Sequence, residues 1–182
     1  MAIVRIRKYG EKILGKKMPR MNYPDFKGKL AGILSDMWET MERARGIGLA
    51  APQIGLPLRL AIVDVKPGGQ SSRIVLINPE LIEGAGDSME VEGCLSIPGY
   101  FIKLRRFYRV RIRALDEAGV PIESVGEGIL ARAFQHEIDH LDGKLIIDRL
   151  PFFQRQKALL ALRNELPCRR ATRPNLPRND IF

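Results

Sequence analysis

The stretch "FQHEIDHLDG", from Phe134 to Gly143, holds the only two histidines of a 182-residue chain. It ends a longer segment, 127–141, whose apolar periodicity predicts a helix. Side chains four apart in a helix lie one above the other, so His136 and His140 can reach one metal ion. Glu137 projects about 100° around the helix from His136. It would lie beside such an ion, where it can take a proton from metal-bound water.

A tetrahedral catalytic site needs a third protein ligand and keeps one open position. Glu165 follows His140 by 25 residues, as in metalloproteases that complete this motif with a downstream glutamate. Cys94 precedes His136 by 42 residues, and its thiolate is a softer, stronger ligand for zinc or ferrous iron than a carboxylate. We therefore favour Cys94. Glu165 is kept as the alternative, in which the protein would be an endopeptidase.

The rest of the chain predicts an α+β domain with mostly antiparallel sheets packed around this central helix. Helical periodicity favours an N-terminal helix over 24–45, and Pro151 opens a C-terminal helix that runs to about Arg163. Strand-like runs cover 59–65, 72–81, 109–115 and 121–125. In "RVRIRAL" (109–115) arginines alternate with apolar residues, which predicts one basic and one apolar face. Few helices among many short strands are typical of the α+β class.

Composition places the chain among soluble single-domain proteins. Hydrophobic residues make up 45% of it, enough for a core, and no apolar run is long enough to span a membrane. The first residues lack the apolar stretch of a secretory signal, so we expect a mature N-terminus and a cytoplasmic protein. The chain has two cysteines, Cys94 and Cys168, in unlike surroundings, so we expect no disulfide framework and no role for Cys168.

The net charge of +9 is concentrated at the two ends. Residues 1–30 carry nine basic and two acidic side chains, and residues 151–182 carry seven and two. Such asymmetry favours a polyanionic partner such as RNA. We expect a catalytic domain over 1–166 and a basic, Pro/Arg-rich tail over 167–182, held in place by the two terminal side chains, Ile181 and Phe182.

Three segments together resemble the peptide deformylase family: "GIGLAAPQIG" (46–55), "EGCLSIPG" (92–99) and "QHEIDHLDG" (135–143). Their order and spacing match the family's motifs, and the resemblance extends from residue 1 to about residue 163. The family removes the formyl group from the N-terminal formylmethionine of new bacterial polypeptides and releases formate. The resemblance implies the same hydrolysis here, with metal-bound water attacking the formyl carbonyl.

The resemblance also implies roles for individual residues. The metal ligands would be Cys94, His136 and His140, and the general base would be Glu137. The oxyanion would be held by the side-chain amide of Gln53 and the backbone N–H of Leu95. One divalent ion per chain is implied, Fe²⁺ in the cell, with Zn²⁺, Ni²⁺ or Co²⁺ also able to occupy a site of one sulfur and two nitrogens.

The substrate would lie next to these groups. Helical steps place Ile129 and Ala133 on the face that carries both histidines, and with Ile47 they would form an apolar slot for a methionine side chain. The resemblance implies that the backbone of Gly48 meets the bound peptide, and we expect Gly93 to line the site too. We expect Arg132 at the rim of the slot or in solvent. Asp139 and Asp142 are candidates to orient the ligand imidazoles, with Asp142 also serving the helix stop.

The partners implied are nascent formyl-Met polypeptides and, through the basic C-terminal segment, the ribosome. We expect the last helix to turn its apolar residues mostly toward the body and its basic residues toward solvent; these are Phe152, Phe153, Leu159, Leu160 and Leu162, and Arg155, Lys157 and Arg163. We expect a monomer, with contacts through the tail as the alternative. A non-catalytic RNA-binding relative is the remaining rival, but it would not need a complete catalytic set.

Overall fold

The computed structural model describes residues 3–65 and 71–165, without the side chains of the last three. The helices are α1 (Tyr23–Arg43), α2 (Gly128–Leu141) and α3 (Phe152–Glu165), with short 3₁₀ turns η1 (Lys12–Gly15), η2 (Ala51–Ile54) and η4 (Ile146–Arg149). The strands are β1 (Gly48–Ala50), β2 (Leu60–Val65), β3 (Ser72–Cys94), β4 (Ile97–Leu115) and β5 (Pro121–Glu127).

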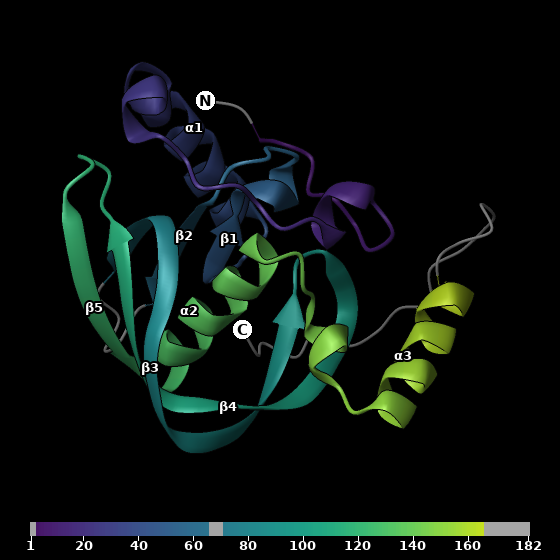
Figure 1. Cartoon of the computed structure of the whole chain (residues 1–182). Coiled ribbons are helices and arrows are strands. Elements are labelled where there is room, and N and C mark those ends of the chain that lie inside the picture. The colour runs from purple at the N-terminus through teal and green to yellow at the C-terminus, as the bar shows by residue number, and fades with distance from the viewer. Residues whose placement is uncertain (1–2, 66–70, 166–182) are drawn as a thin grey trace.

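The strands form one antiparallel sheet in the order β1-β2-β3-β4-β5. The sheet curves around α2, which lies at the centre of the molecule (Figure 1). The predicted α+β class with a central motif-bearing helix is therefore confirmed. The residues that connect β2 to β3, 66–70, lie outside the described residues.

Strands β3 and β4 are much longer than the sequence predicted. They pair from Ile77 opposite Leu115 to Cys94 opposite Ile97, and register shifts interrupt the ladder at three places. Residues 80–91 are exposed or half-buried at every position, so they lack the apolar alternation by which a strand is recognised. Backbone pairing with the partner strand decides their structure instead.

Helix α1 covers one face of the sheet's N-terminal strands. Pro24 stands in its first turn, where the missing N–H costs nothing. Its buried side chains repeat at steps of four and three and join a core cluster with β2; they are Leu30, Leu34, Met37 and Met41. The helix predicted over 24–45 is confirmed within two residues of each end.

Helix α2 packs one side against the sheet and turns its opposite side to the site described below. Phe134 and Leu141 have no exposed surface and share a core cluster with Val110 and Ile112 of β4. The helix ends as predicted, because Gly143 takes the left-handed conformation (φ 72°) that favours glycine.

The predicted basic face of β4 is present. Arg109, Arg111 and Arg113 are exposed, and the residues between them are buried. Each arginine forms an ion pair with a glutamate of a neighbouring strand, so this face is not a free cationic surface. Exposed pairs of this kind typically contribute about 0–1 kcal/mol.

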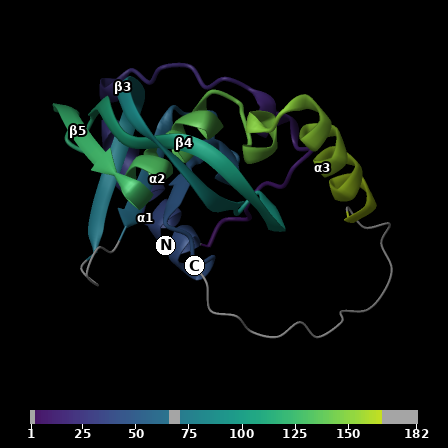
Figure 2. The ribbon, with the colours of Figure 1, turned by 90° about the horizontal axis from the view of Figure 1, so that it is seen from below.

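Helix α3 stands at the edge of the molecule (Figures 1 and 2). The expectation that its apolar residues face the body is wrong for three of them: Phe152, Phe153 and Leu160 are 67%, 85% and 60% exposed. Among the α3 side chains that are described, 152–162, Ala158 and Leu162 are the buried ones, and they join the cluster around η4. At about 100° per residue, Phe153 and Leu160 lie on the side of α3 opposite these two contacts.

The predicted tail over 167–182, with Cys168, Ile181 and Phe182, lies outside the described residues. Among the helices that are described, none is both long and apolar enough to cross a membrane.

Candidate metal centre

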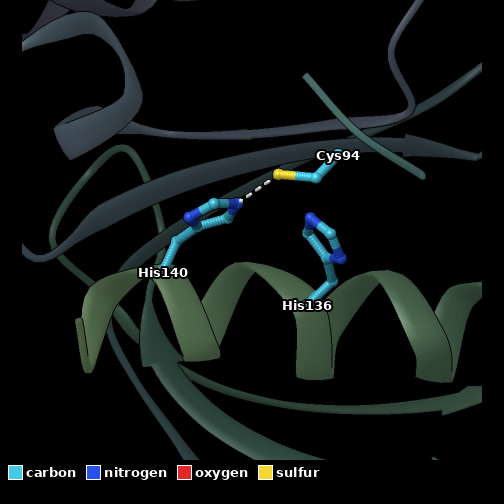
Figure 3. A group of neighbouring side chains, drawn as sticks. All are labelled: Cys94, His136 and His140. Carbon is cyan, nitrogen blue, oxygen red and sulfur yellow. Dashed lines mark hydrogen bonds between the residues drawn. The ribbon is translucent and has the colours of Figure 1, made fainter. Parts of the chain in front are cut away.

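Cys94, His136 and His140 come together in space, as the sequence predicted for the favoured ligand set. Their candidate ligand atoms all lie within 4.8 Å of one another. Cys94 ends β3, and its Sγ lies 3.2 Å from His140 Nε2 (Figure 3). The two imidazole rings rise from adjacent turns of α2, with centroids 5.0 Å apart. One sulfur and two nitrogens thus converge from two elements far apart in sequence.

The electrostatics of the three residues favour a thiolate. Burial raises the pKa of the Cys94 thiol, but the neighbouring imidazoles, His140 first, outweigh it and hold this pKa well below its usual range. Burial lowers the pKa of His136, while Cys94 and Glu92 raise it well above its usual range. Without a metal, protons therefore occupy the imidazole side of the cluster. A divalent ion would displace them, because only neutral imidazoles coordinate.

Glu92 fixes the orientation of His136, a role the sequence analysis missed. Its Oε2 lies 3.1 Å from His136 Nδ1, which leaves the other ring nitrogen, Nε2, available to bind a metal ion. Arg106 and Arg132 hold the same carboxylate through hydrogen bonds of 2.7–2.9 Å. Burial raises the pKa of Glu92, but Arg106 and His136 outweigh it and hold this pKa well below its usual range. Its place two residues before Cys94, on the same face of β3, was the available signal.

The expectations for three charged neighbours, Asp139, Asp142 and Arg132, need correction. Asp139 does not contact a ligand imidazole; it accepts hydrogen bonds from Arg106 (2.6 Å) and Arg149. Asp142 pairs with Arg59 at 2.8 Å, next to the helix stop. Arg132 is neither at a rim nor in solvent. It is 8% exposed, because Glu92 and the carbonyls of Ser88 and Leu104 accept its N–H groups.

Glu137 lies beside the three ligand atoms and is not one of the cluster. Its side chain packs against Gly48 of β1, where a Cβ would lie 2.4 Å from Glu137 Oε1. The other oxygen, Oε2, is buried and has no hydrogen-bond partner among the described residues. Burial raises the pKa of Glu137 to about 7. His136 and His140 lower this pKa, but less than burial raises it, and Cys94 and Glu92 raise it further. Such a carboxyl can exchange a proton near neutral pH.

Gln53 reaches the site from η2, on the side opposite α2. Its Oε1 accepts from the Ala50 N–H at 2.8 Å, which orients the amide so that Nε2 points toward the cysteine. Nε2 lies 3.2 Å from Ser96 Oγ and 3.9 Å from Cys94 Sγ. Leu95 and Ser96 form the turn directly after Cys94, so the backbone of Leu95 adjoins the same group.

The residues expected to contact substrate are distributed around this centre. Ile47 and Ile129 are 38% and 42% exposed, whereas Ala133 is buried in the core cluster behind α2. Gly93 is exposed, and a Cβ there would meet the ring of Phe101 at 2.9 Å. Ile47 and Ile129 are therefore available to a ligand in a way that Ala133 is not.

The donor set fits a divalent metal. A thiolate and two imidazoles suit zinc, ferrous iron, nickel or cobalt, and an unpartnered carboxylate oxygen lies beside them. The alternative ligand, Glu165, is on the last turn of α3, and its side chain is outside the described residues. Within the described chain this is the one group of three or more potential ligands. Fold and cluster together define a metal-dependent hydrolase built on an H-E-x-x-H helix.

The particular family follows from comparison with known proteins. Residues 3–156 match the model of the polypeptide deformylase family. A peptide deformylase from Thermodesulfovibrio yellowstonii is 47% identical over 157 residues, which cover 86% of this chain and 94% of the relative. One from Aquifex aeolicus is 42% identical over 153 residues, covering 83% and 89%.

Solved structures agree. A peptide deformylase from Legionella pneumophila superimposes with a TM-score of 0.83 at 40% identity, covering 93% of this chain and all of the other. The enzyme from Thermus thermophilus gives 0.82 at 41% identity, covering 90% and 95%. The chain belongs to the peptide deformylase family, whose enzymes hydrolyse the N-terminal formyl amide of polypeptides.

Proposed function

We propose that this chain removes the formyl group from formyl-Met polypeptides with a divalent ion held by Cys94, His136 and His140. The observation that carries the proposal is the convergence of these three residues beside a buried, unpartnered carboxylate on the same helix. When bound, the ion would supply Lewis-acid activation of water and of the formyl carbonyl. All other steps fall to side chains and backbone groups of the chain.

Glu137 is the proposed general base. Among the described residues its Oε2 has no hydrogen-bond partner, so it is free to accept a proton from the attacking water. The same carboxyl can then deliver that proton to the departing amine, so that formate and a free N-terminus result. A pKa near 7 suits both directions of transfer.

Gln53 and the backbone N–H of Leu95 are the proposed donors to the oxyanion that develops on the formyl carbonyl. The Gln53 amide is held by Ala50 and brings no charge into the site. Donors fixed in advance are effective because they need not reorganise during the reaction; loss of one typically costs about 10²–10³ in rate.

The methionine side chain of the substrate is assigned to the surface that includes Ile47 and Ile129, both partly exposed. Gly48 and Gly93 would leave room for the peptide backbone, and Ala133, which is buried, would support the slot from behind without offering exposed surface. This assignment of Ile47, Gly48, Gly93, Ile129 and Ala133 follows the family resemblance.

The decisive assay measures formate released from a formyl-Met peptide. Protein is prepared anaerobically with Fe²⁺, Zn²⁺, Ni²⁺ or Co²⁺, and an acetyl-Met peptide serves as the matched control substrate. We expect formate with at least one metal, Fe²⁺ being the proposed cellular ion, and no acetate. Absence of formate with every metal would refute the proposal.

Variants of the site separate the proposed roles. We expect Glu137→Gln to keep the metal and to lower kcat by about 10²–10⁴-fold, because the ligands remain while the base is lost. Cys94→Ala should lose both metal and activity, and Glu165→Ala should lose neither. Metal retained in Cys94→Ala but absent from Glu165→Ala would instead identify the endopeptidase alternative.

We further propose that the protein acts in the cytoplasm as a monomer that docks on the ribosome through α3 and the basic segment that follows. Support comes from Lys157, exposed on α3, and from Phe153 and Leu160, exposed on the same helix. Charge reversal at Arg155 and Lys157 should weaken co-sedimentation with ribosomes at low salt, since phosphate contacts are salt-dependent. Equal pelleting of the variant and the unmodified chain, with equal peptide turnover, would exclude docking through these residues.

A further inference from the structure

An extended N-terminal segment, residues 3–9, ties together the two loops that carry the proposed oxyanion donors. The Arg7 N–H donates to the Gln53 carbonyl at 2.7 Å, and the Tyr9 N–H donates to the Ser96 carbonyl at 2.9 Å. The Val4 N–H is anchored on Thr40 Oγ1 of α1 at 3.0 Å. One segment thus contacts η2 on one side of the site and the turn after Cys94 on the other.

The turn after Cys94 is only two residues long. Cys94 pairs with Ile97, so Leu95 and Ser96 project beyond the end of the hairpin. The N-terminal segment occupies both of their carbonyls: Ser96 O accepts from Tyr9, and Leu95 O accepts from Lys8 Nζ at 2.8 Å. Both carbonyl acceptors of the turn are therefore occupied by the N-terminal segment.

The backbone of Lys8 is held in place, so that its ammonium can donate to the Leu95 carbonyl. Its own N–H donates to Glu11 Oε1 at 2.9 Å, and the Glu11 N–H donates back to the Lys8 carbonyl at 3.0 Å. The side chain is half-buried. The hydrogen bond to Leu95 fixes the rotation of the peptide unit that follows Leu95, while strand pairing fixes Cys94 before it. The direction of the Leu95 N–H is set between these two constraints.

We propose that Lys8 is a positioning residue for the hydrolysis: its ammonium fixes the Leu95 carbonyl and so aims the Leu95 N–H at the developing oxyanion. The inference rests on the proposed function, and in particular on Leu95 as a donor. Lys8 is not one of the proposed metal ligands or substrate contacts, and its ammonium donates to the Leu95 carbonyl. Its effect should therefore appear in the catalytic step and not in substrate binding, since a displaced donor loses transition-state stabilisation.

The test compares Lys8→Met, Lys8→Gln and Lys8→Arg in the full-length, metal-loaded chain, with formyl-Met peptide as substrate. Methionine lacks a donor, the glutamine amide is shorter, and arginine keeps a cationic donor. Lys12→Met is the matched control, because Lys12 is exposed in the neighbouring turn η1. We expect kcat to fall about tenfold or more in Lys8→Met and Lys8→Gln, with KM within about twofold, a smaller loss than full removal of a donor. Lys8→Arg should recover part of the rate, and Lys12→Met should match the unmodified chain.

Melting temperature and bound metal are measured for every variant, and both should equal those of the unmodified chain. The inference is overturned if Lys8→Met and Lys8→Gln keep kcat within twofold, if only KM rises, or if Lys8→Arg is as impaired as they are. It is also overturned if the rate falls only in step with melting temperature or metal content. Failure of the proposed function is a different result, because the unmodified chain itself would then release no formate.

Discussion

At the scale of single residues, Gly48 and Glu137 fit each other closely. A Cβ on residue 48 would lie 2.4 Å from Glu137 Oε1 and 2.9 Å from Cδ, distances that real Cβ atoms do not adopt. From the sequence, Gly48 was expected to admit the substrate backbone. The structure shows a second reason for glycine, which is that the Glu137 carboxylate, the proposed general base, occupies the space where a side chain would be.

We predict that Gly48→Ala displaces the Glu137 carboxylate and lowers kcat by about 10²-fold, the typical consequence of moving a catalytic group by about 1 Å. Bound metal should be unchanged, because no ligand contacts residue 48. Steady-state kinetics and metal analysis check both expectations. Gly32→Ala on α1 is the control, since a Cβ there meets nothing within 4 Å. Equal kcat in the two variants would show that Gly48 does not set the position of the base.

At the scale of elements, the last residues of strand β3 place two side chains, Glu92 and Cys94, on one face. Glu92 and Cys94 are both buried, and successive side chains on a strand alternate between faces. His136 of α2 contacts both residues. Its Nδ1 lies against Glu92, and its imidazole also belongs to the cluster with Cys94. Strand and helix are thereby joined through a ligand and its supporting carboxylate.

We predict that Glu92→Gln lowers metal affinity by about 10–100-fold, the usual effect of removing a supporting carboxylate. It should also destabilise the metal-free protein by about 3–5 kcal/mol, because Arg132 would be left buried without its counter-charge and Arg106 would keep only Asp139. Competition with a chelating dye measures the first effect, and urea unfolding the second. Glu90→Gln, at an exposed position of the same strand, should change neither.

The same carboxylate predicts an acid-sensitive stability. The pKa of Glu92 is held below its ordinary value of 4.5: burial opposes the shift, and Arg106 and His136 cause it. A lowered folded-state pKa stabilises the fold above the unfolded-state value and loses that contribution as pH falls toward the folded-state value. We expect the free energy of unfolding of the metal-free chain to fall as pH is lowered below about 4.5. Glu92→Gln should flatten this slope, and an equal slope would rule out Glu92 as its source.

At the scale of the whole molecule, the candidate metal site joins the β3–β4 hairpin to α2. Cys94 belongs to the hairpin, and His136 and His140 belong to the helix (Figure 3). A metal bound only by the folded chain shifts the folding equilibrium toward the folded state. Its removal should therefore affect the whole molecule.

We predict that a chelator lowers the melting temperature of the metal-loaded chain by several degrees, since one kilocalorie per mole corresponds to about 2–4 °C at this size. Calorimetry before and after chelation measures the shift, and re-addition of metal should reverse it. Cys94→Ala, which lacks a ligand, should show no shift. A melting temperature that stays constant while metal analysis shows complete removal would contradict the prediction.

The sequence alone predicted the helices, parts of four strands and the cluster of Cys94, His136 and His140. His136, Glu137 and His140 are four residues or fewer apart on one helix, so local geometry fixes their relation. Cys94 followed from the chemistry of thiolates and from the resemblance of its motif. The alternating face of 109–115 was likewise readable, because burial on one side of a strand imposes a period of two.

Only the tertiary structure decided which charged residues support the site and which apolar residues are exposed. Arg132 reads as a surface residue in sequence, yet it is buried because Glu92, 40 positions away, accepts its hydrogen bond. Phe153 reads as a packing residue, yet it is exposed because the body meets α3 on the opposite side. Lys8 gains its place from Leu95, 87 positions away. Each of these outcomes depends on partners that no local pattern specifies, since folding alone brings them within bonding distance.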